Sequence, residues 1–230
     1  MRRTKICLIL SLLLATTAGC QTTGEDPYRR DFELYVEGQE LENVNLDPDI
    51  GGDIDVGADR DRLGARFAFG PDKVRGFFHV FKENWQYTDL PGGLRGAEYD
   101  NWGIGGGLKG EPVVKTFEND LKMLVPYRGD ISFVWGEHED DSEWEMRYVE
   151  IHLEAAFAID WRGLRPAAGL AVSGIGGLLE GYGTDTGISG GNAGLFLDLS
   201  YQHPEFPLYG HIRAMGGDYR MLVIGFGAKF

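Results

Sequence analysis

Hydrophobic and polar residues alternate along much of the chain with a period of two, which is the period of a β-strand. The clearest run covers residues 147–161, "RYVEIHLEAAFAIDW". A helix would scatter Glu150, Glu154 and Asp160 through its apolar stripe, whereas a strand places them all on one face, opposite Ile151 and Leu153. The run is also longer than the ~5–6 residues of a typical soluble strand and exceeds the ~9–11 residues that cross a membrane at a tilt. It therefore predicts a membrane-spanning strand.

The same alternation recurs along the rest of the chain with varying clarity. It predicts strands at 30–38, 62–70, 74–87, 98–110, 119–136, 144–161, 165–174, 191–203, 206–217 and 219–230. The pattern at 98–110 is weak because "GIGGGLKG" offers few side chains, and Pro126 requires a bulge or a break. The prediction is an all-β fold: one antiparallel up-and-down transmembrane β-barrel over residues 30–230, with about ten strands, or eight as the alternative.

Connection lengths and aromatic residues support a transmembrane barrel. Long polar or glycine-rich connections are expected at 39–61, 88–97, 137–143 and 175–190, and short ones at 70–73, 162–164 and 204–205. Transmembrane barrels alternate long outer loops with short periplasmic turns in this way. Aromatic residues gather near the expected strand ends, where we expect them to lie at the headgroup level: Trp85, Tyr87, Tyr99, Trp102, Trp135, Trp144, Trp161, Tyr201 and Tyr219.

The first residues have the features of a secretion signal. Arg2, Arg3 and Lys5 precede an apolar run over 6–15, which is too short to span a membrane as a helix. The following "LLATTAGC" ends at Cys20 and resembles the lipobox of bacterial lipoproteins. The resemblance implies a signal peptide over 1–19, acylation of Cys20, palmitate included, and a short lipidated linker over 20–29. An ordinary signal peptide is the alternative. Gln21, in place of an aspartate, favours sorting to the outer membrane by the lipoprotein-sorting machinery.

Residues 30–230 resemble the small outer-membrane β-barrels of Gram-negative bacteria. The last residues, "IGFGAKF", place Ile224, Phe226 and Phe230 on one face, and this is similar to the signal that the barrel-assembly machinery recognises. The resemblance implies a location in the cell outer membrane, with the N-terminus in the periplasm. Outer-membrane lipid and lipopolysaccharide would then surround the chain.

Charge and cysteine content narrow the possible functions. The 230-residue chain has a net charge of −14, which excludes nucleic-acid binding through phosphate neutralisation. Its two cysteines, Cys7 and Cys20, lie in the signal and at its end. A barrel without other cysteines contains no disulfide, no cysteine catalysis and no cysteine-rich metal site.

The inward face of the expected barrel carries charges of both signs. Isolated buried ions are costly, so these charges must pair. We expect them to form a salt-bridged plug; a narrow polar channel is the alternative. The cluster expected in the lumen consists of Arg62, Arg66, Arg75, Glu150, His152, Glu154, Asp160 and Arg213.

Two motifs suggest chemistry only weakly. In "EIHLE", His152 lies between two carboxylates and could act as a general base for Ser132 or Ser200, but no compact catalytic motif accompanies it. Asp53, Asp55 and Asp59 faintly resemble a calcium loop without the closing glutamate. We therefore expect no enzyme, no cofactor and no metal centre. A weak divalent-cation bridge to lipopolysaccharide is the alternative to a solvated acidic loop.

Three function classes follow from the sequence. The first is an outer-membrane β-barrel lipoprotein with a structural or interaction role. The second is a narrow channel for small solutes. The third is a soluble, lipid-anchored β-barrel that binds an apolar ligand, which would require apolar residues inside and charged residues outside. The face of residues 149–161 that meets the barrel axis discriminates the third class from the first two.

Overall fold

The fold is taken from a computed structural model of the chain. It describes residues 29–48, 54–71, 73–88, 98–139, 143–181, 184–203, 205–217 and 219–230. The predicted signal peptide, Cys20 and the predicted linker up to residue 28 lie outside the described residues. Within the described residues, no helix has the length and the apolar content needed to cross a membrane.

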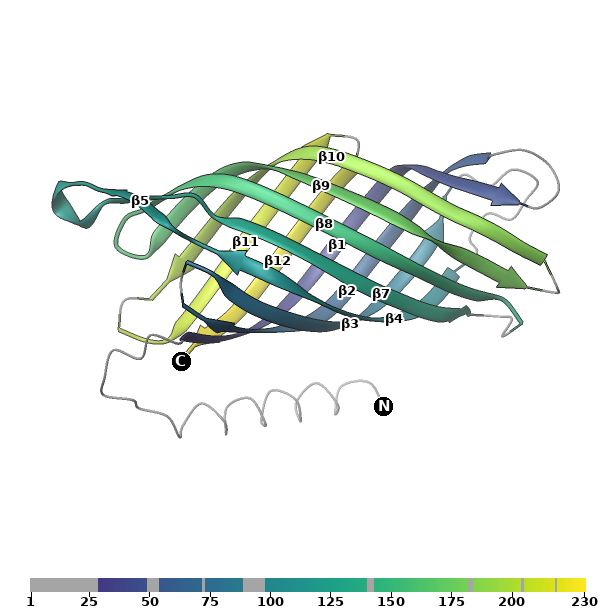
Figure 1. Ribbon diagram of the computed structural model, residues 1–230, viewed down its shortest axis with the longest axis horizontal. Helices are drawn as coiled ribbons and strands as arrows, with labels where there is room; N and C mark the ends of the chain where they lie inside the picture. Colours follow the sequence, from purple (N-terminus) through teal and green to yellow (C-terminus); the bar gives the residue numbers. More distant parts are fainter. Residues whose placement is uncertain are drawn as a thin grey trace.

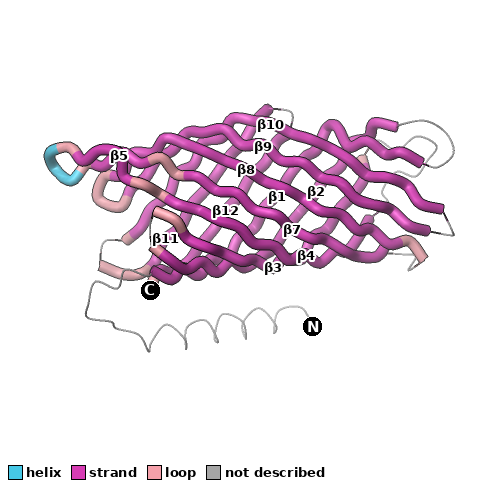
Figure 2. Tube along the Cα trace, in the orientation of Figure 1, coloured by secondary structure: helices cyan, strands magenta, loops and turns pink. Residues whose placement is uncertain are grey.

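Almost all described residues belong to antiparallel strands (Figure 2). The strands are β1 (Arg29–Pro48), β2 (Ile54–Gly70), β3 (Arg75–Tyr87), β4 (Glu98–Gly110), β5 (Val113–Thr116), β6 (Lys122–Leu124), β7 (Tyr127–His138), β8 (Glu145–Asp160), β9 (Leu164–Gly181), β10 (Thr184–Gln202), β11 (Leu208–Gly217) and β12 (Tyr219–Lys229). One short 3₁₀ helix, η1 (Glu118–Asp120), lies between β5 and β6.

The strands form one closed barrel. Hydrogen bonds run in a ring through ten strands, β1, β2, β3, β4, β7, β8, β9, β10, β11 and β12, and the ring closes where β12 pairs with β1. Each strand is antiparallel to its neighbours, and the strands tilt strongly across the barrel axis (Figure 1). The predicted all-β, up-and-down barrel with ten strands is therefore confirmed. We call the end that holds Arg29 and Phe230 the terminal end, and the opposite one the far end.

Pro126 breaks the predicted strand at 119–136 into two. Residues Lys122–Leu124 form β6, which pairs with the end of β8, and β7 begins at Tyr127. With β5, β6 forms a small hairpin that projects beyond the terminal end of the barrel (Figure 1). The weakly patterned segment 98–110 is a full strand, β4.

The glycines of β4 accommodate the large side chains of β3. Gly103 lies directly opposite Phe81, and a Cβ added to Gly103 would be only 2.1 Å from the Phe81 ring. Gly105 lies opposite His79 in the same way. β4 therefore lacks a hydrophobic pattern because its glycines leave room for the large side chains of β3.

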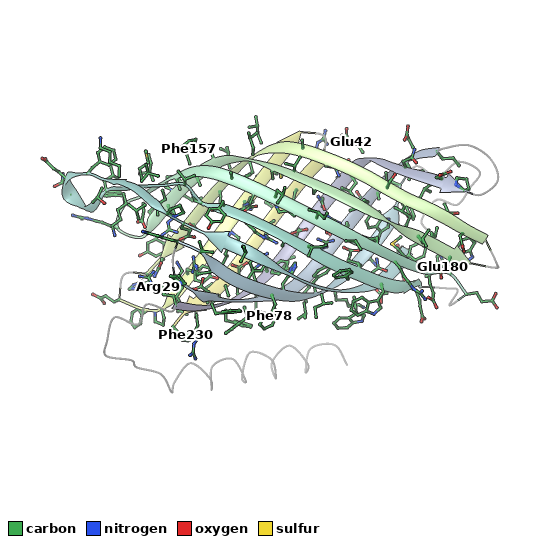
Figure 3. All side chains as sticks on the ribbon, in the orientation of Figure 1. Arg29, Glu42, Phe78, Phe157, Glu180 and Phe230 are labelled. Carbon is green, nitrogen blue, oxygen red and sulfur yellow. The ribbon has the colours of Figure 1, made fainter. Side chains whose placement is uncertain are left out.

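An apolar belt surrounds the terminal half of the barrel. The outward-facing side chains there are large and exposed; Phe157 is 69% exposed and Leu153 54%. Phe78 and Phe157 point away from the barrel in Figure 3. The belt contains Val36, Leu63, Phe69, Phe78, Val80, Trp102, Ile104, Leu108, Ile131, Phe133, Trp135, Ile151, Leu153, Phe157, Ile159, Trp161, Leu170, Val172, Leu195, Leu197, Leu199, Tyr201, Ile212, Leu222, Ile224, Phe226 and Phe230.

The polarity reverses in the far half. Here the outward side chains are mostly acidic, and we call them the acidic collar: Glu40, Glu42, Asp59, Asp61, Asp100, Glu137, Glu139 and Asp185. The interior is apolar and is filled by Leu41, Val44, Leu46, Val56, Ala58, Trp85, Tyr87, Tyr99, Met146, Ile175, Leu179 and Ile188. The far half therefore has the polarity of a soluble barrel, and the terminal half has the inverse polarity.

This reversal explains two errors of the sequence analysis. The segments 39–61 and 175–190 were expected to be loops, but most of their residues extend β1, β2, β9 and β10. Their outward positions are mostly acidic, polar or glycine, with Leu178 as an apolar exception, so they lack the continuous apolar outer face of a membrane strand. Trp85, Tyr87 and Tyr99 were expected at the headgroup level, but they are at most 3% exposed and pack inside the far half. Trp102, Trp135, Trp161 and Tyr201 do face outward.

The first strand changes its partner between the two halves. Up to Leu41, β1 pairs with β12; from Val44 to Pro48 it pairs with β10 instead. The register of β1 against β2 shifts between Leu41 and Val44, where the exchange takes place. Because barrel diameter grows with strand number, bypassing the β11–β12 hairpin narrows the far half and lets side chains fill it.

Candidate functional site

The polar interior of the terminal half is the candidate site. A cavity of about 180 Å³ extends from the terminal end inward to the level of Arg60 and Glu150. Charged side chains of both signs line it, contributed by strands around the whole ring. The apolar residues of the far half, such as Trp85 and Ile188, are not among its lining residues.

The innermost part of the site is a cluster of two arginines and two glutamates. Arg62 donates to Glu83 at 2.6 Å and to Glu150 at 2.5 Å. Arg60 donates to Glu150 at 2.9 Å, and the Tyr148 hydroxyl donates to Glu83 at 2.6 Å. Glu83 is fully buried. Every charge of this cluster therefore has an opposite charge within hydrogen-bonding distance, as burial requires.

A second cluster lies closer to the terminal end on the other side of the lumen. Arg213 donates to Glu154 at 2.5 Å and to Asp198 at 3.0 Å. His211 lies 3.4 Å from Asp198 and 3.6 Å from Glu33. These contacts connect β8, β10, β11 and β1 across the lumen rather than only along neighbouring strands.

A third cluster crosses the lumen near the terminal end. Arg75 pairs with Asp31 and lies 3.6 Å from Glu111. Arg165 donates to Glu111 at 2.6 Å and to Asp160 at 2.9 Å. Burial alone would raise the pKa of the Glu111 carboxyl, but Arg165, Lys229, Arg75 and Lys109 outweigh it and hold that pKa at about 2. Glu111 follows β4 and is fixed between strands on opposite sides of the ring.

The structure brings the residues of the predicted lumen cluster into these three groups. Arg62 and Glu150 belong to the innermost cluster, Glu154 and Arg213 to the second, and Arg75 and Asp160 to the third. Arg66 pairs with Glu33 at 2.7 Å, and His152 lies 3.1 Å from Glu154. All eight predicted residues therefore point inward.

The alternation also places Glu83 and Asp198 on the inward face, but the sequence analysis missed four further members of the site. Arg60 was hidden in the segment 39–61, which was expected to be a loop, although it continues the alternation of Arg62 and Arg66. Glu111 lies between strands, where no parity applies. Asp31 and Arg165 lie near the starts of β1 and β9. Asp31 pairs with Arg75 two strands away on β3, and Arg165 pairs with Glu111, which follows β4. Asp31 has the inward parity of Glu33 on the predicted strand 30–38, and Arg165 begins the predicted strand 165–174, so the alternation carries a signal for both. Glu111 has no such signal.

The suggested general base and its serine partners do not meet. His152 contacts Glu154, whereas Ser132 lies 3.1 Å from His79, and Ser200 donates to the backbone oxygen of Arg165. Ser132 is 2% exposed, beneath the Tyr35, His79 and Asp130 side chains that line the cavity. The neighbours of His152 are thus those of an ion-pair network.

The weak calcium candidate divides between two regions. Asp53 lies outside the described residues. Asp55 and Asp59 are exposed on β2 and are separated by four residues of extended strand, about 13 Å at the usual rise. The described part of the chain contains no group of three His, Cys, Asp or Glu side chains that could hold a metal ion.

The residues of the predicted assembly signal lie on the outer surface. Ile224 and Phe226 are 52% and 60% exposed on β12, in the belt. Phe230 pairs with Arg30 of β1 through two backbone hydrogen bonds, 2.7 and 3.1 Å long. The end of the described chain is therefore fixed to its beginning.

No model of a known protein family matches the sequence, and no curated protein is similar to it. Among solved structures, the chain is similar to the transport unit of the autotransporter AIDA-I from Escherichia coli, with 9% identity over 96% of each chain and a TM-score of 0.40. It is similar to the translocator domain of the autotransporter NalP from Neisseria meningitidis, with 12% identity over 98% of this chain and 96% of that one and a TM-score of 0.40. It is also similar to OccK7 (OpdD) from Pseudomonas aeruginosa, with 7% identity over 88% and 99% of the chains and a TM-score of 0.29. At these scores the barrel assignment rests on the strand pairing of the chain itself.

Proposed function

We propose that the protein is an outer-membrane β-barrel lipoprotein with a structural or interaction role. The observation that supports this most directly is the inverse polarity of the terminal half, with an apolar belt outside and paired charges inside. Side chains such as Leu153 and Phe157 are costly to expose to water as a continuous belt, but they suit lipid. The terminal half would span the membrane, and the far half would project from it.

The orientation follows from the topology. Because the ring has an even number of strands, both ends of the described chain lie on the same side. A lipid on Cys20 would hold the N-terminus at the periplasmic leaflet, so the terminal end would face the periplasm and the far end the exterior. Because few residues separate Cys20 from Arg29, the acyl chains and the barrel would lie in the same membrane.

The interior supports a structural role over transport. Ion pairs cross the lumen in the terminal half, and apolar side chains fill the far half. A solute would have to displace both. The third function class requires an apolar interior and a charged surface at residues 149–161, and those residues have the opposite arrangement. The surface offered to the exterior would be the acidic collar.

Position-specific quenching tests the membrane assignment. We would place single cysteines by Leu153→Cys, Glu154→Cys and Asp59→Cys in the full chain carrying Cys7→Ser and Cys20→Ser. Each would be labelled with an environment-sensitive fluorophore and folded into vesicles that contain lipid-attached quenchers.

The probe at residue 153 should be quenched strongly, and those at 154 and 59 should not. Leu153 lies in the belt, its neighbour Glu154 faces the lumen, and Asp59 lies in the collar. Equal quenching at 153 and 154, or none at either, would overturn the proposal. Quenching at residue 59 would show that the far half does not project from the membrane.

A test of the lipid anchor is independent of this one. Metabolic labelling with a palmitate analogue should modify the wild-type chain and not the Cys20→Ser variant. Cys20→Ser should still leave the barrel in the outer-membrane fraction. A fully soluble, folded variant would mean that lipid is the sole anchor and that the barrel does not span.

A further inference from the structure

Exposed charges have opposite signs at the two ends of the barrel. Beyond the far edge of the belt the exposed charges are mainly acidic. Beyond the terminal edge the exposed charged side chains are mainly basic; Glu118 and Glu205 are the exposed acidic ones among the side chains that the structure describes there. We call the basic ones the basic rim: Arg29, Arg30, Lys73, Lys115, Lys122 and Arg162.

The two ends also differ in how their cations are paired. In the far half, the exposed cations Lys82, Arg147 and Arg220 each lie within 4.0 Å of a carboxylate. Among the described residues, no ion pair includes Lys115, Lys122 or Arg162 of the rim. The side chains of these three residues are exposed. Lys115, Lys122 and Arg162 therefore offer positive charge that no described carboxylate of the protein neutralises.

The basic groups of the rim lie beside exposed apolar side chains, one of which, Trp161, belongs to the belt. The Arg162 guanidinium lies 5.8 Å from the ring centre of Trp161, which is 51% exposed at the belt edge. The Lys115 ammonium lies 4.7 Å from the ring of Phe117 on the projecting hairpin. On the same hairpin Val113 and Val114 are at least half exposed. Basic groups beside exposed aromatic and aliphatic side chains suit a membrane interface, where the apolar part enters the lipid and the charge meets headgroups.

We propose that the basic rim, with the β5–β6 hairpin, binds the anionic headgroups of phospholipids in the leaflet at the terminal end. The occupant is a lipid surface because the rim follows the edge of the belt around much of the ring, from β1 through the β2–β3 turn to the hairpin and the β8–β9 turn. Each basic group near an anionic surface strengthens binding severalfold, and salt weakens this attraction. The inference rests on the proposed membrane function, because the rim lies at a headgroup layer only if the belt lies in lipid.

The experiment compares two triple variants that remove the same charge. One carries Lys115→Gln, Lys122→Gln and Arg162→Gln in the rim; the other carries Lys82→Gln, Arg147→Gln and Arg220→Gln in the far half. The full chain, folded in neutral detergent, would be titrated with phosphatidylglycerol or with phosphatidylethanolamine of the same acyl chains. Native mass spectrometry then measures bound lipid.

The wild-type chain should bind phosphatidylglycerol at least about tenfold more tightly than phosphatidylethanolamine, given the contribution of each basic group. The rim variant should lose most of this preference, and the far-half variant should keep it. Equal affinities of the wild type for the two lipids, or equal losses in the two variants, would overturn the proposal. Displacement of the lipid by excess inorganic phosphate would identify a plain anion site and would also overturn it.

The quenching measurement keeps the two proposals apart. A chain whose Leu153 probe is quenched by lipid, but which shows no lipid preference, contradicts the rim alone. A chain whose Leu153 probe is not quenched contradicts the membrane assignment itself.

Discussion

Arg62 and Glu83 lie directly opposite each other on neighbouring strands β2 and β3, and the Arg62 Nε donates to the Glu83 carboxylate at 2.6 Å. The same arginine reaches Glu150 on β8, on another part of the ring. A cross-strand pair is thus also a link across the lumen. The interior of the barrel is held by contacts that do not follow the order of the strands.

Replacing Glu83 should destabilise the barrel much more than replacing its neighbour. Glu83→Gln leaves Arg62 and Arg60 short of one buried carboxylate, which costs about 3 kcal/mol or more in the free energy of unfolding. Lys82→Gln removes a pair with Asp100 whose side chains are about half exposed, and it should cost at most about 1 kcal/mol. Urea unfolding in vesicles measures both. Equal costs would mean that the lumen pairs are solvated.

Two glycine-to-alanine substitutions should also differ in how much they destabilise the barrel. Gly103→Ala forces a Cβ against the Phe81 ring and should cost about 1–3 kcal/mol through overpacking. Gly176→Ala on β9 meets no atom within 4 Å and should leave the unfolding midpoint nearly unchanged. If both variants unfold like the wild type, the ring of Phe81 does not cover β4.

Bilayer recordings should show no steady conductance from the wild-type chain. Glu150→Gln weakens the innermost ion pairs with Arg60 and Arg62, yet it should not open a channel, because the apolar core of the far half remains. A steady current from this variant would show that the charged cluster alone closes the lumen. Large, stable openings of the wild type would contradict a plugged lumen altogether.

The third cluster should make stability depend on pH at the acidic side. The pKa of Glu111 lies at about 2 in the folded barrel, below its ordinary value of 4.5. Its stabilising contribution is therefore complete above pH 4.5 and is lost as the pH falls through about 2. The shift corresponds to roughly 3 kcal/mol.

Glu111→Gln should reduce stability at neutral pH and flatten the dependence between pH 5 and pH 2. Urea midpoints of both proteins across this range provide the measurement. Arg165→Gln, which removes the 2.6 Å partner, should have a similar effect. Parallel curves for wild type and Glu111→Gln would refute the assignment to this carboxylate.

The alternation of polarity was enough to predict the barrel and its strand number. In the terminal half, the period of two separates belt residues such as Leu153 from lumen residues such as Glu154, and each parity maps to one side of the wall. The same reasoning placed Arg62, Glu150 and Arg213 inside. It works because one face of the wall is apolar and the other face is charged.

The far half could not be predicted in this way. There the outer face is acidic, so residues such as Asp59 and Asp61 suggested a loop, and the apolar residue Val56 suggested no particular side. The assignment of Trp85 to a headgroup layer failed because an aromatic residue near a strand end can point either way. Which charges pair across the lumen, such as Arg165 with Glu111, depends on the stagger of the ring, and the local sequence does not encode it.

The exchange of partners along β1 has a consequence for how the strand number of such a barrel could evolve. Residues Val44–Pro48 are already hydrogen-bonded to β10, with the β11–β12 hairpin inserted only below them. One molecule thus contains two alternative closures, one between its first and last strands and one between its first strand and β10. If a terminal hairpin were lost or gained, the barrel would close by extending a strand pairing that already exists, and it would not need a new one. Strand number, which looks fixed in a closed barrel, becomes a quantity that a single duplication or deletion can alter.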